Sequence, residues 1–284
     1  MIILTLFILF GYLICNFIYK PVSQNALKDQ LLTQIDSNTS IYFQDINNGS
    51  SFGINENKLY SPASLIKVPL LIALLKESET DPSILDKEIL NTESYDPKVQ
   101  NIQPQVTLIP NKKYTIKQLI EQMIIYSDDI SYNLLNQQTS ADKIIKIYND
   151  LNIDISQALS SPKGDIISAK DYTTFFRILY NSSYLNPTMS KYALKILGQT
   201  DFKDGIVASI PPDINVSHKF GERQYLDTGS KQLHDCGIVY YPNKPYLLCI
   251  MTRGDNFESL KSKIKNISKT VYDNISLLNY QASI

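Results

Sequence analysis

The stretch SPASLIKVPLLIALL, residues 61–75, constrains the fold of this chain more than any other. After Lys67 every residue up to Leu75 is apolar, so a helix here is apolar on all sides and belongs in a protein core. Ser64 and Lys67 stand three residues apart, which places both side chains on one helix face, with Cβ atoms roughly 5–6 Å apart. A serine hydroxyl becomes a good nucleophile when a base takes its proton, and a lysine that its surroundings keep neutral is such a base. The stretch therefore predicts a buried helix that carries a nucleophile and its base.

The spacing Ser-x-x-Lys is by itself a weak signal. It also occurs at residues 160–163, where a proline predicts a loop, and at residues 262–265, in a polar helical pattern. A short motif of this kind needs support from its context. The interpretation of Ser64 as a nucleophile therefore depends on the motifs that follow it.

Length and composition describe a globular protein without a strongly charged partner. The 284 residues suit one large or two small domains, and a hydrophobic content of 43% is typical of a globular chain. The net charge of −1 gives no reason to expect nucleic acid. With two histidines and no cluster of cysteines, the sequence predicts neither a metal site nor a cofactor. We expect a monomer.

Residues 1–19 carry no charged side chain and form a run that nearly spans a bilayer. They lack the basic flank and the small-residue cleavage site of a signal peptide. We therefore expect residues 1–20 to be a retained membrane anchor, with a globular domain at residues 21–284 outside the cytoplasm. Cleavage and secretion are the alternative that this pattern leaves open.

Hydrophobic periodicity and turn residues indicate helices and strands in an order that suits an α/β fold of the α+β type. Helices are predicted at about 21–37, 64–75, 116–126, just after 129, 141–152, 168–180, 187–198 and 257–278, and strands at 41–46, 51–54, 214–220, 235–241 and 246–252. Residues 81–111 look irregular. Strands near both ends of the chain most economically share one antiparallel sheet. We expect a sheet lobe with terminal helices (21–60 and 212–284) against an all-helical lobe (61–211), and a ligand cleft between them.

Cys236 and Cys249 fall on the two strands of a predicted hairpin, whereas Cys15 lies in the apolar leader. With a turn at residues 242–245, the register places these two cysteines diagonally rather than opposite each other. A disulfide between them is therefore allowed but not favoured.

Three motifs follow one another along the chain: Ser64-Leu-Ile-Lys67, Ser127-Asp-Asp129 and Lys219-Phe-Gly221. In this order they resemble the penicillin-recognising serine hydrolases, the superfamily of class A β-lactamases and penicillin-binding proteins, whose signature is S-x-x-K, S-D-N and K-T-G. The resemblance covers about residues 21–280. It implies a β-lactamase/DD-peptidase-like fold, a β-lactam or peptidoglycan peptide as substrate, and hydrolysis of a β-lactam amide.

The resemblance also implies roles for individual residues. Ser64 attacks a carbonyl and forms an acyl-enzyme, and Lys67 accepts its proton directly or through water. Ser127 relays a proton to the leaving nitrogen. Lys219, on an edge strand, keeps Lys67 neutral by repulsion and orients a substrate carboxylate. 

The remaining implied roles belong to the strand that follows Lys219. Gly221 lets the strand backbone approach the substrate closely. The backbone N–H groups of Ser64 and Glu222 form an oxyanion hole, in which one donor is typically worth about 10²–10³ in rate.

Two residues depart from the family pattern within the motifs. Asp129 replaces the usual Asn, and a carboxylate only accepts hydrogen bonds, so it can bind a substrate N–H but repels an anionic group. Phe220 replaces the hydroxyl residue that normally binds the substrate carboxylate. Both substitutions predict weak binding of penicillins.

A third departure concerns deacylation. Class A β-lactamases use a glutamate between the second and third motifs to activate water, but this chain has no glutamate between Glu121 and Glu222. Asp154 or Asp165 could substitute only with a shifted backbone, because proton transfer requires strict geometry. The sequence thus supports acylation but not efficient turnover of β-lactams.

Two other readings of the chain stay open at this point. A D-Ala-D-Ala peptidase that β-lactams merely inhibit agrees with the missing glutamate, and a non-catalytic cell-wall binding module agrees with Phe220 and Asp129. Of the other polar residues, we expect Asp128 to bond backbone N–H groups and both histidines, His218 and His234, to be structural. Arg253 is expected either at the surface or at a substrate carboxylate.

Overall fold

A five-stranded antiparallel sheet joins the two ends of the described chain. The computed structural model describes residues 24–98, 100–156, 161 and 164–282. The strands lie in the order β2-β1-β9-β8-β7, and their bounds are β1 Thr39–Asp45, β2 Ser51–Ile54, β7 Val216–Gln224, β8 Lys231–Val239 and β9 Tyr246–Gly254. The sheet predicted from strands near both ends is therefore confirmed, and β2 and β7 are its edge strands.

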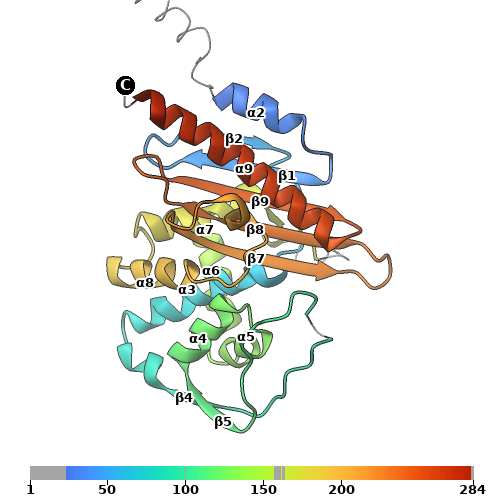
Figure 1. Ribbon diagram of the computed structural model, residues 1–284. Helices are drawn as coiled ribbons and strands as arrows, with labels where there is room; N and C mark the ends of the chain where they lie inside the picture. The colour runs from blue at the N-terminus through green and yellow to red at the C-terminus, as the bar shows by residue number, and fades with distance from the viewer. Residues whose placement is uncertain (1–23, 99, 157–160, 162–163, 283–284) are drawn as a thin grey trace, which may run out of the picture.

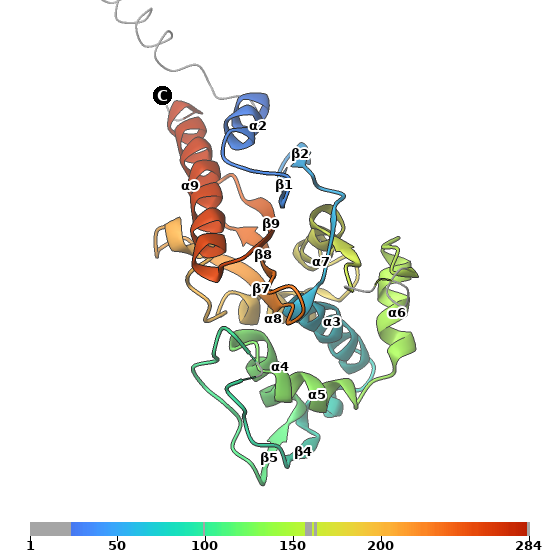
Figure 2. The same ribbon diagram turned by 90° about the vertical axis from the view of Figure 1, so that its right-hand side faces the viewer.

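Helices cover both faces of this sheet (Figure 1). The helices α2 (Gln24–Leu32) and α9 (Phe257–Ala282) lie on one face, and α7 (Ala169–Tyr180) lies on the other, as the edge-on view of Figure 2 shows. Alternation along β9 explains the two layers: Leu248 and Ile250 pack toward α9, whereas Leu247 and Met251 pack into the core that contains α7. The expected α+β fold class is confirmed.

The helix α3 (Lys67–Ser78) is the centre of the helical lobe. Each residue from Lys67 to Leu75 is buried, as its apolar sequence predicts. Around it pack α4 (Ile116–Ile125), α5 (Asp129–Asn136), α6 (Ala141–Asp150) and α8 (Pro187–Leu197). Thr115 and Gln118 form a capping box, so α4 begins at the start of the predicted helix at 116–126. The lobe boundaries at residues 60 and 212 stay a prediction, and within them α7 packs on the sheet as well.

Several short elements complete the described chain. They are β3 (Leu59–Tyr60), which pairs with β6 (Ile167–Ser168), β4 (Glu88–Asn91), which pairs with β5 (Lys112–Thr115), and the 3-10 helices η1 (Ala63–Ile66), η2 (Pro82–Asp86) and η4 (Ile206–Ser209). The expectation that residues 81–111 are irregular is therefore wrong in part, because η2 and β4 fall within them. Strand β4 needs β5 as its partner, and such pairing is not visible in the local sequence.

Two further predictions need correction. The helix predicted at 21–37 ends at Leu32, because the Asp36 carboxylate binds the N–H of Asn38 and the hydroxyl of Thr39 and so turns the chain into β1. Cys236 lies directly opposite Cys249, and the two form a disulfide. The hairpin loop begins at residue 240, two residues earlier than predicted, and this shift turns a diagonal pair into a facing one.

No helix among the described residues is both long and apolar enough to cross a membrane. The membrane anchor predicted for residues 1–20 lies outside the described residues.

Candidate active site

Ser64 lies in η1, which runs directly into α3. Ala63 has a φ of 46°, which is uncommon for a residue with a Cβ atom and marks a constrained turn just before Ser64. The helical path then brings Lys67 under Ser64, with 2.9 Å between Lys67 Nζ and Ser64 Oγ. Lys67 is only 1% exposed, whereas Ser64 is half-buried. The predicted placement of Ser64 and Lys67 on one helical face is confirmed.

Pro69 does not interrupt the helix that carries this pair. A proline has no N–H to donate to the carbonyl four residues earlier, which here is Leu65 O. The Tyr172 hydroxyl of α7 donates to Leu65 O instead, at 3.0 Å, in a buried position. The carbonyl of Leu65, which Pro69 leaves without a helical donor, thus accepts a hydrogen bond that connects the Ser64 turn to α7.

Ser127 lies in the turn between α4 and α5 and also has a positive φ, of 57°. Its carbonyl accepts from Lys67 Nζ at 2.5 Å and from Gln100 Nε2 at 3.1 Å. Asp128 caps the N-terminus of α5 and accepts from the N–H of Ser131 at 2.6 Å, so its expected structural role is confirmed. These contacts fix the Ser127 side chain beside Lys67.

Lys219 reaches Ser127 from the edge strand β7. Its side chain is fully buried, and Lys219 Nζ donates to Ser127 Oγ at 2.8 Å and to Phe220 O at 3.0 Å. Lys67 Nζ lies 3.3 Å from the same hydroxyl oxygen. The Ser127 hydroxyl therefore stands between two lysines, and a path of polar contacts runs from Ser64 through Lys67 and Ser127 to Lys219.

The register of β7 directs alternate backbone groups off the open edge of the sheet. Tyr225 N donates to Ser230 O across the hairpin, and bonded pairs alternate with non-bonded pairs from there along β7 and β8. Phe220 and Glu222 fall in the non-bonded positions, so their backbone groups point away from β8. The bond from Lys219 Nζ to Phe220 O agrees with this direction. The Glu222 N–H therefore points off the edge of the sheet, as an oxyanion donor requires.

Gly221 lets β7 pack directly against the Ser64 turn. A Cβ atom at this position would lie 2.9 Å from Pro62 O and 3.0 Å from Leu65 Cγ. The close approach predicted for Gly221 thus exists, but between strand and turn. The glycine sets the distance between Ser64 and the backbone of β7.

Asp129 forms an ion pair with Lys67 that the sequence did not predict. Asp129 Oδ1 lies 2.5 Å from Lys67 Nζ, and the Asp129 side chain is 38% exposed whereas that of Lys67 is 1% exposed. Lys67 Nζ also donates to Ser64 Oγ and Ser127 O, so its three protons have three acceptors. These three contacts fit a protonated Lys67 in the resting enzyme. Lys67 must therefore lose a proton before it can act as a base.

Burial and charge act on the pKa of both lysines. Burial lowers the pKa of Lys67, and the nearby Asp129 carboxylate opposes this effect. Burial also holds the pKa of Lys219 well below its ordinary value, and the Lys67 charge lowers it further. The expectation that repulsion by Lys219 keeps Lys67 neutral is therefore wrong in its cause, because loss of hydration is the main effect at Lys67.

Phe220 is 4% exposed and belongs to the apolar core on the α9 side of the sheet. Its ring stacks on Phe202, with 4.4 Å between the ring centroids, and Lys219 Nζ lies 4.3 Å from the Phe220 centroid. The ring is thus occupied by contacts within the protein. Its predicted role at the substrate stays a prediction.

Two residues of the irregular stretch after β4 lie at the site although no local pattern indicates it. Gln100 Nε2 donates to Ser127 O, and Asn101 donates to the Glu222 carboxylate through its backbone N–H and through Nδ2, each at 2.7 Å. The stretch therefore connects the Ser127 turn with the end of β7. Only the three-dimensional closure of the chain reveals these contacts.

Both aspartates suggested as the base for deacylation, Asp154 and Asp165, accept hydrogen bonds from other residues of the protein. Asp165 accepts hydrogen bonds from Arg253, Gln232 and Tyr225, which occupy both of its oxygens. Asp154 is exposed and accepts from the N–H of Ser156. Arg253 is paired with Asp165 at 2.5 Å and stays 22% exposed, and its contact with a substrate carboxylate stays a prediction.

Both histidines are fixed within the fold, as expected. His218 Nδ1 donates to Asp235 Oδ1 at 2.8 Å, and Asp235 Oδ2 accepts from the N–H of Ile206. Burial lowers the pKa of His234 to about 4, so this ring is neutral and donates through Nε2 to Ser61 O. Neither ring contacts Ser64 in the described structure. Metal-binding groups of three or more His, Cys, Asp or Glu are not found within that part of the chain.

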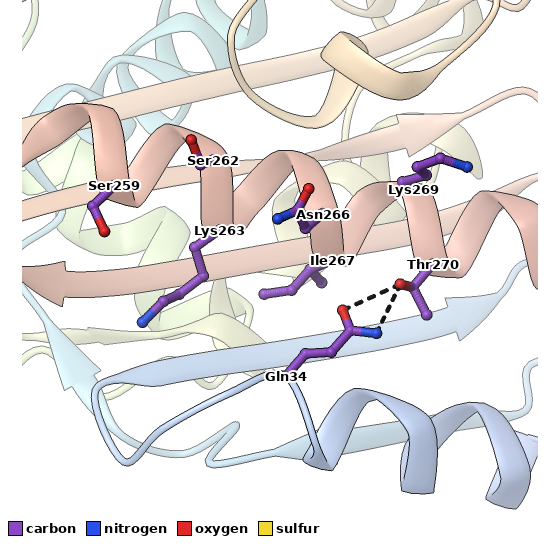
Figure 3. Close-up of a pocket in the computed structure, with 8 residues that line it drawn as sticks. All are labelled: Gln34, Ser259, Ser262, Lys263, Asn266, Ile267, Lys269 and Thr270. Atoms are coloured by element: carbon purple, nitrogen blue, oxygen red, sulfur yellow. Dashed lines mark hydrogen bonds between the residues drawn. The ribbon is translucent and has the colours of Figure 1, made fainter.

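A cavity of about 600 Å³ lies on another side of the molecule, between α9 and Gln34 (Figure 3). Gln34 and Thr270 are hydrogen-bonded across it. Because α9 covers the sheet face opposite the helical lobe, this groove is separate from the Ser64 site.

Comparison with protein families decides which group of enzymes this site belongs to. The model of the Beta-lactamase2 family, described as the Beta-lactamase enzyme family, matches residues 24–275. The chain belongs to the Beta-lactamase enzyme family. With Ser64, Lys67, Ser127 and Lys219 in contact, it is a serine hydrolase of the β-lactamase type.

Solved structures agree with this family at the level of the fold. TLA-3 extended-spectrum β-lactamase has a TM-score of 0.78 at 16% identity, and the match covers 89% of this chain and 99% of that one. The class A β-lactamase from Mycobacterium abscessus has a TM-score of 0.74 at 19% identity, with coverages of 88% and 99%. PBP-A has a TM-score of 0.72 at 22% identity, with coverages of 91% and 98%. The chain therefore shares its fold, over most of its length, with these β-lactamases and with PBP-A.

Proposed function

We propose that this enzyme takes the acyl group of an amide or ester onto Ser64. The observation that carries the proposal is the contact of 2.9 Å between Ser64 Oγ and Lys67 Nζ in a buried, fixed geometry. A nucleophile and base already in contact avoid the entropic cost of meeting in the transition state. The lowered pKa of Lys67 brings its neutral form within reach.

Each proton in the proposed reaction has a route. Neutral Lys67 takes the proton of Ser64 Oγ while the Oγ–carbon bond forms. The proton then passes from Lys67 to the leaving atom through the Ser127 hydroxyl, 3.3 Å from Lys67 Nζ, as the bond to the leaving group breaks. Lys219 donates to this hydroxyl and so leaves the hydroxyl proton free to face the leaving group. Water later forms the new bond to the acyl carbon, the bond from that carbon to Ser64 Oγ breaks, and the proton that the water loses returns to Ser64 Oγ.

The N–H groups of Ser64 and Glu222 supply the proposed oxyanion hole. Gly221 supports it, because the close packing of β7 on the turn at Pro62 holds the two donors at a fixed separation. Preorganised donors of this kind stabilise the negative oxygen of the tetrahedral intermediate.

We propose that deacylation is slow, so that β-lactams acylate the enzyme and leave it slowly. This places it with penicillin-binding, peptidase-like enzymes rather than with fast β-lactamases. The absence of a glutamate between residues 121 and 222 and the committed oxygens of Asp165 support this choice. PBP-A is an apt relative, because a PBP-A variant has been solved as an acyl-enzyme complex with penicillin G. For such an enzyme, we propose that the natural reaction is the hydrolysis of a peptidoglycan peptide.

We also propose that the enzyme works outside the cytoplasm and is held at the membrane by residues 1–20. The uncharged run in this segment supports the proposal, and so does the Cys236–Cys249 disulfide, since disulfides persist mainly in oxidising compartments. Fractionation of cells that express the full chain tests both parts. Recovery from the cytosolic fraction with reduced cysteines would contradict them.

The acylation proposal is tested by following the intact mass of the full chain during reaction with a penicillin and with a chromogenic cephalosporin. We expect an adduct that persists for many minutes, with little colour release after the first equivalent. An adduct that decays quickly with steady colour release would instead indicate an efficient β-lactamase. If no acyl donor of any class gives an adduct, the non-catalytic binding module is the better description.

A further inference from the structure

We propose that the preferred substrate carries no carboxylate next to the scissile bond and has a neutral or cationic group there instead. Penicillins and peptides that end in D-Ala-D-Ala carry an anionic carboxylate at this place, on the leaving-group side. The inference rests on the proposed acylation of Ser64 and specifies its substrate class: an internal amide or a neutral ester, such as a peptide bond within a chain, rather than a C-terminal one.

The first observation is that the cation beside the Ser127 hydroxyl, on the leaving-group side, already has partners. Lys219 is fully buried, and its ammonium group lies between Ser127 Oγ, Phe220 O and the Phe220 ring. Arg253 lies level with Arg223 across the sheet, farther from Ser127, and is paired with Asp165 at 2.5 Å. A substrate carboxylate would have to displace one of these contacts before it gained a cation.

Arg223 is the remaining cation on β7, and it lies at the wrong end of the site. It is four residues beyond Lys219, about 13 Å along an extended strand. Its guanidinium group donates to Ser61 Oγ at 2.8 Å and lies 4.7 Å from the centroid of the Tyr225 ring. Along β7, Glu222 with its proposed oxyanion donor therefore lies between Arg223 and Lys219, the residue that contacts the Ser127 hydroxyl.

The second observation is the loss of the hydroxyl that would bind a carboxylate. Phe220 stands at that position, and its ring is buried against Phe202. No hydroxyl or N–H of this side chain can receive an anion. A neutral or apolar group on the substrate loses nothing by this replacement.

The third observation is the negative charge around the nucleophile. Asp129 Oδ1 is linked to Ser64 Oγ by two contacts through Lys67 Nζ, of 2.5 Å and 2.9 Å, and so lies within about 6 Å of it. The Glu222 carboxylate, held by Asn101, belongs to the residue that supplies the proposed oxyanion donor. When Lys67 is neutral, as its role requires, both carboxylates repel an anionic substrate and attract a cationic one.

A series of three thioesters tests the proposal with the full-length enzyme. All three share one N-acyl-D-alanyl group and differ only in the thiol: thioglycolate is anionic, thioglycolamide is neutral and 2-(trimethylammonio)ethanethiol is cationic. Thiol release gives kcat/KM, and intact mass reports the adduct on the enzyme. We expect the neutral and cationic thioesters to react at least tenfold faster than the anionic one, with a smaller ratio at high salt.

Two variants assign the effect to the named residues. In Asp129→Asn we expect the ratio of anionic to neutral rate to rise about tenfold. This ratio cancels any change in the basicity of Lys67, because both substrates use the same base. Phe220→Thr should raise the same ratio, and the exposed Asp86→Asn is the matched control that should leave it unchanged.

Equal rates for the three thioesters, or a faster anionic one, would overturn the substrate class while acylation itself stood. If the ratio of anionic to neutral rate does not change in Asp129→Asn, Asp129 is not the cause of the discrimination against the anionic thioester. Failure of all three thioesters to acylate the enzyme would overturn the proposed function, and this inference with it.

Discussion

Replacing Asp129 with asparagine should shift the pH dependence of acylation to lower pH. Lys67 must be neutral to take the Ser64 proton, so acylation rises with pH through the pKa of Lys67. The Asp129 carboxylate stabilises the ammonium form and raises this pKa, against the larger lowering effect of burial. Asparagine keeps the shape and the hydrogen bond but removes the charge, so the pKa of Lys67 should fall further.

The size of the shift follows from the geometry of the ion pair. Two unit charges about 4 Å apart interact by about 4 kcal/mol at a dielectric constant of 20 and by about 1 kcal/mol in water. Asp129 is 38% exposed, so the interaction is nearer the lower value after solvent screening. One pKa unit corresponds to about 1.4 kcal/mol, and we therefore expect a shift of about one pH unit. Below the wild-type midpoint, acylation of the variant should be about tenfold faster.

The assay is the pH profile of kcat/KM for a neutral thioester, which avoids any charge effect of the substrate. This quantity reports the pKa values of the free enzyme. Asp86→Asn removes an exposed carboxylate elsewhere and should reproduce the wild-type profile. An ascending limb that stays in place in Asp129→Asn, or moves to higher pH, would refute the reasoning that Asp129 holds the proton on Lys67.

Three further changes test the scaffold of the site. Gly221→Ala places a Cβ atom 2.9 Å from a backbone oxygen, so we expect denaturant titrations to show about 1–3 kcal/mol of lost stability. We also expect acylation to slow by more than this loss of folded protein explains, and an unchanged acylation rate would show that the spacing of β7 is not critical. Asp235→Ala leaves buried His218 without its acceptor and should cost about 3–5 kcal/mol, seen as a lower Tm; a loss below 1 kcal/mol would contradict this. Cys236→Ser opens the disulfide with Cys249 and should cost about 3 kcal/mol, and reductant should destabilise the wild type but not the variant; equal sensitivity of both would argue against the disulfide.

The parts of the fold that the sequence predicts are those set by local pattern. The apolar run after Lys67 requires a buried helix, and the capping residue Thr115 marks where α4 begins. The contact between Ser64 and Lys67 follows from helical spacing alone. Ser127 and Lys219 are 92 residues apart, and only the order of the three motifs indicated that they meet.

Features that depend on register or on chain closure were missed. The hairpin loop between β8 and β9 differs by two residues from the predicted turn, and that difference decides whether Cys236 faces Cys249. Asn101 and Glu222 are 121 residues apart in the sequence but hydrogen-bonded in the structure, and no local sequence pattern indicates this contact. The ion pair of Asp129 with Lys67 was missed because a carboxylate in the second motif was interpreted only through its effect on a substrate.

The most direct test of the account is to locate the acyl group on the chain. Wild type and Ser64→Ala are treated with the neutral thioester and with a penicillin, and the adduct is assigned by intact mass and peptide mapping. We expect one acyl group per wild-type chain, on the peptide that contains Ser64, and none on the variant. An adduct that persists in Ser64→Ala, or that maps to another residue, would contradict the central claim that Ser64 is the nucleophile.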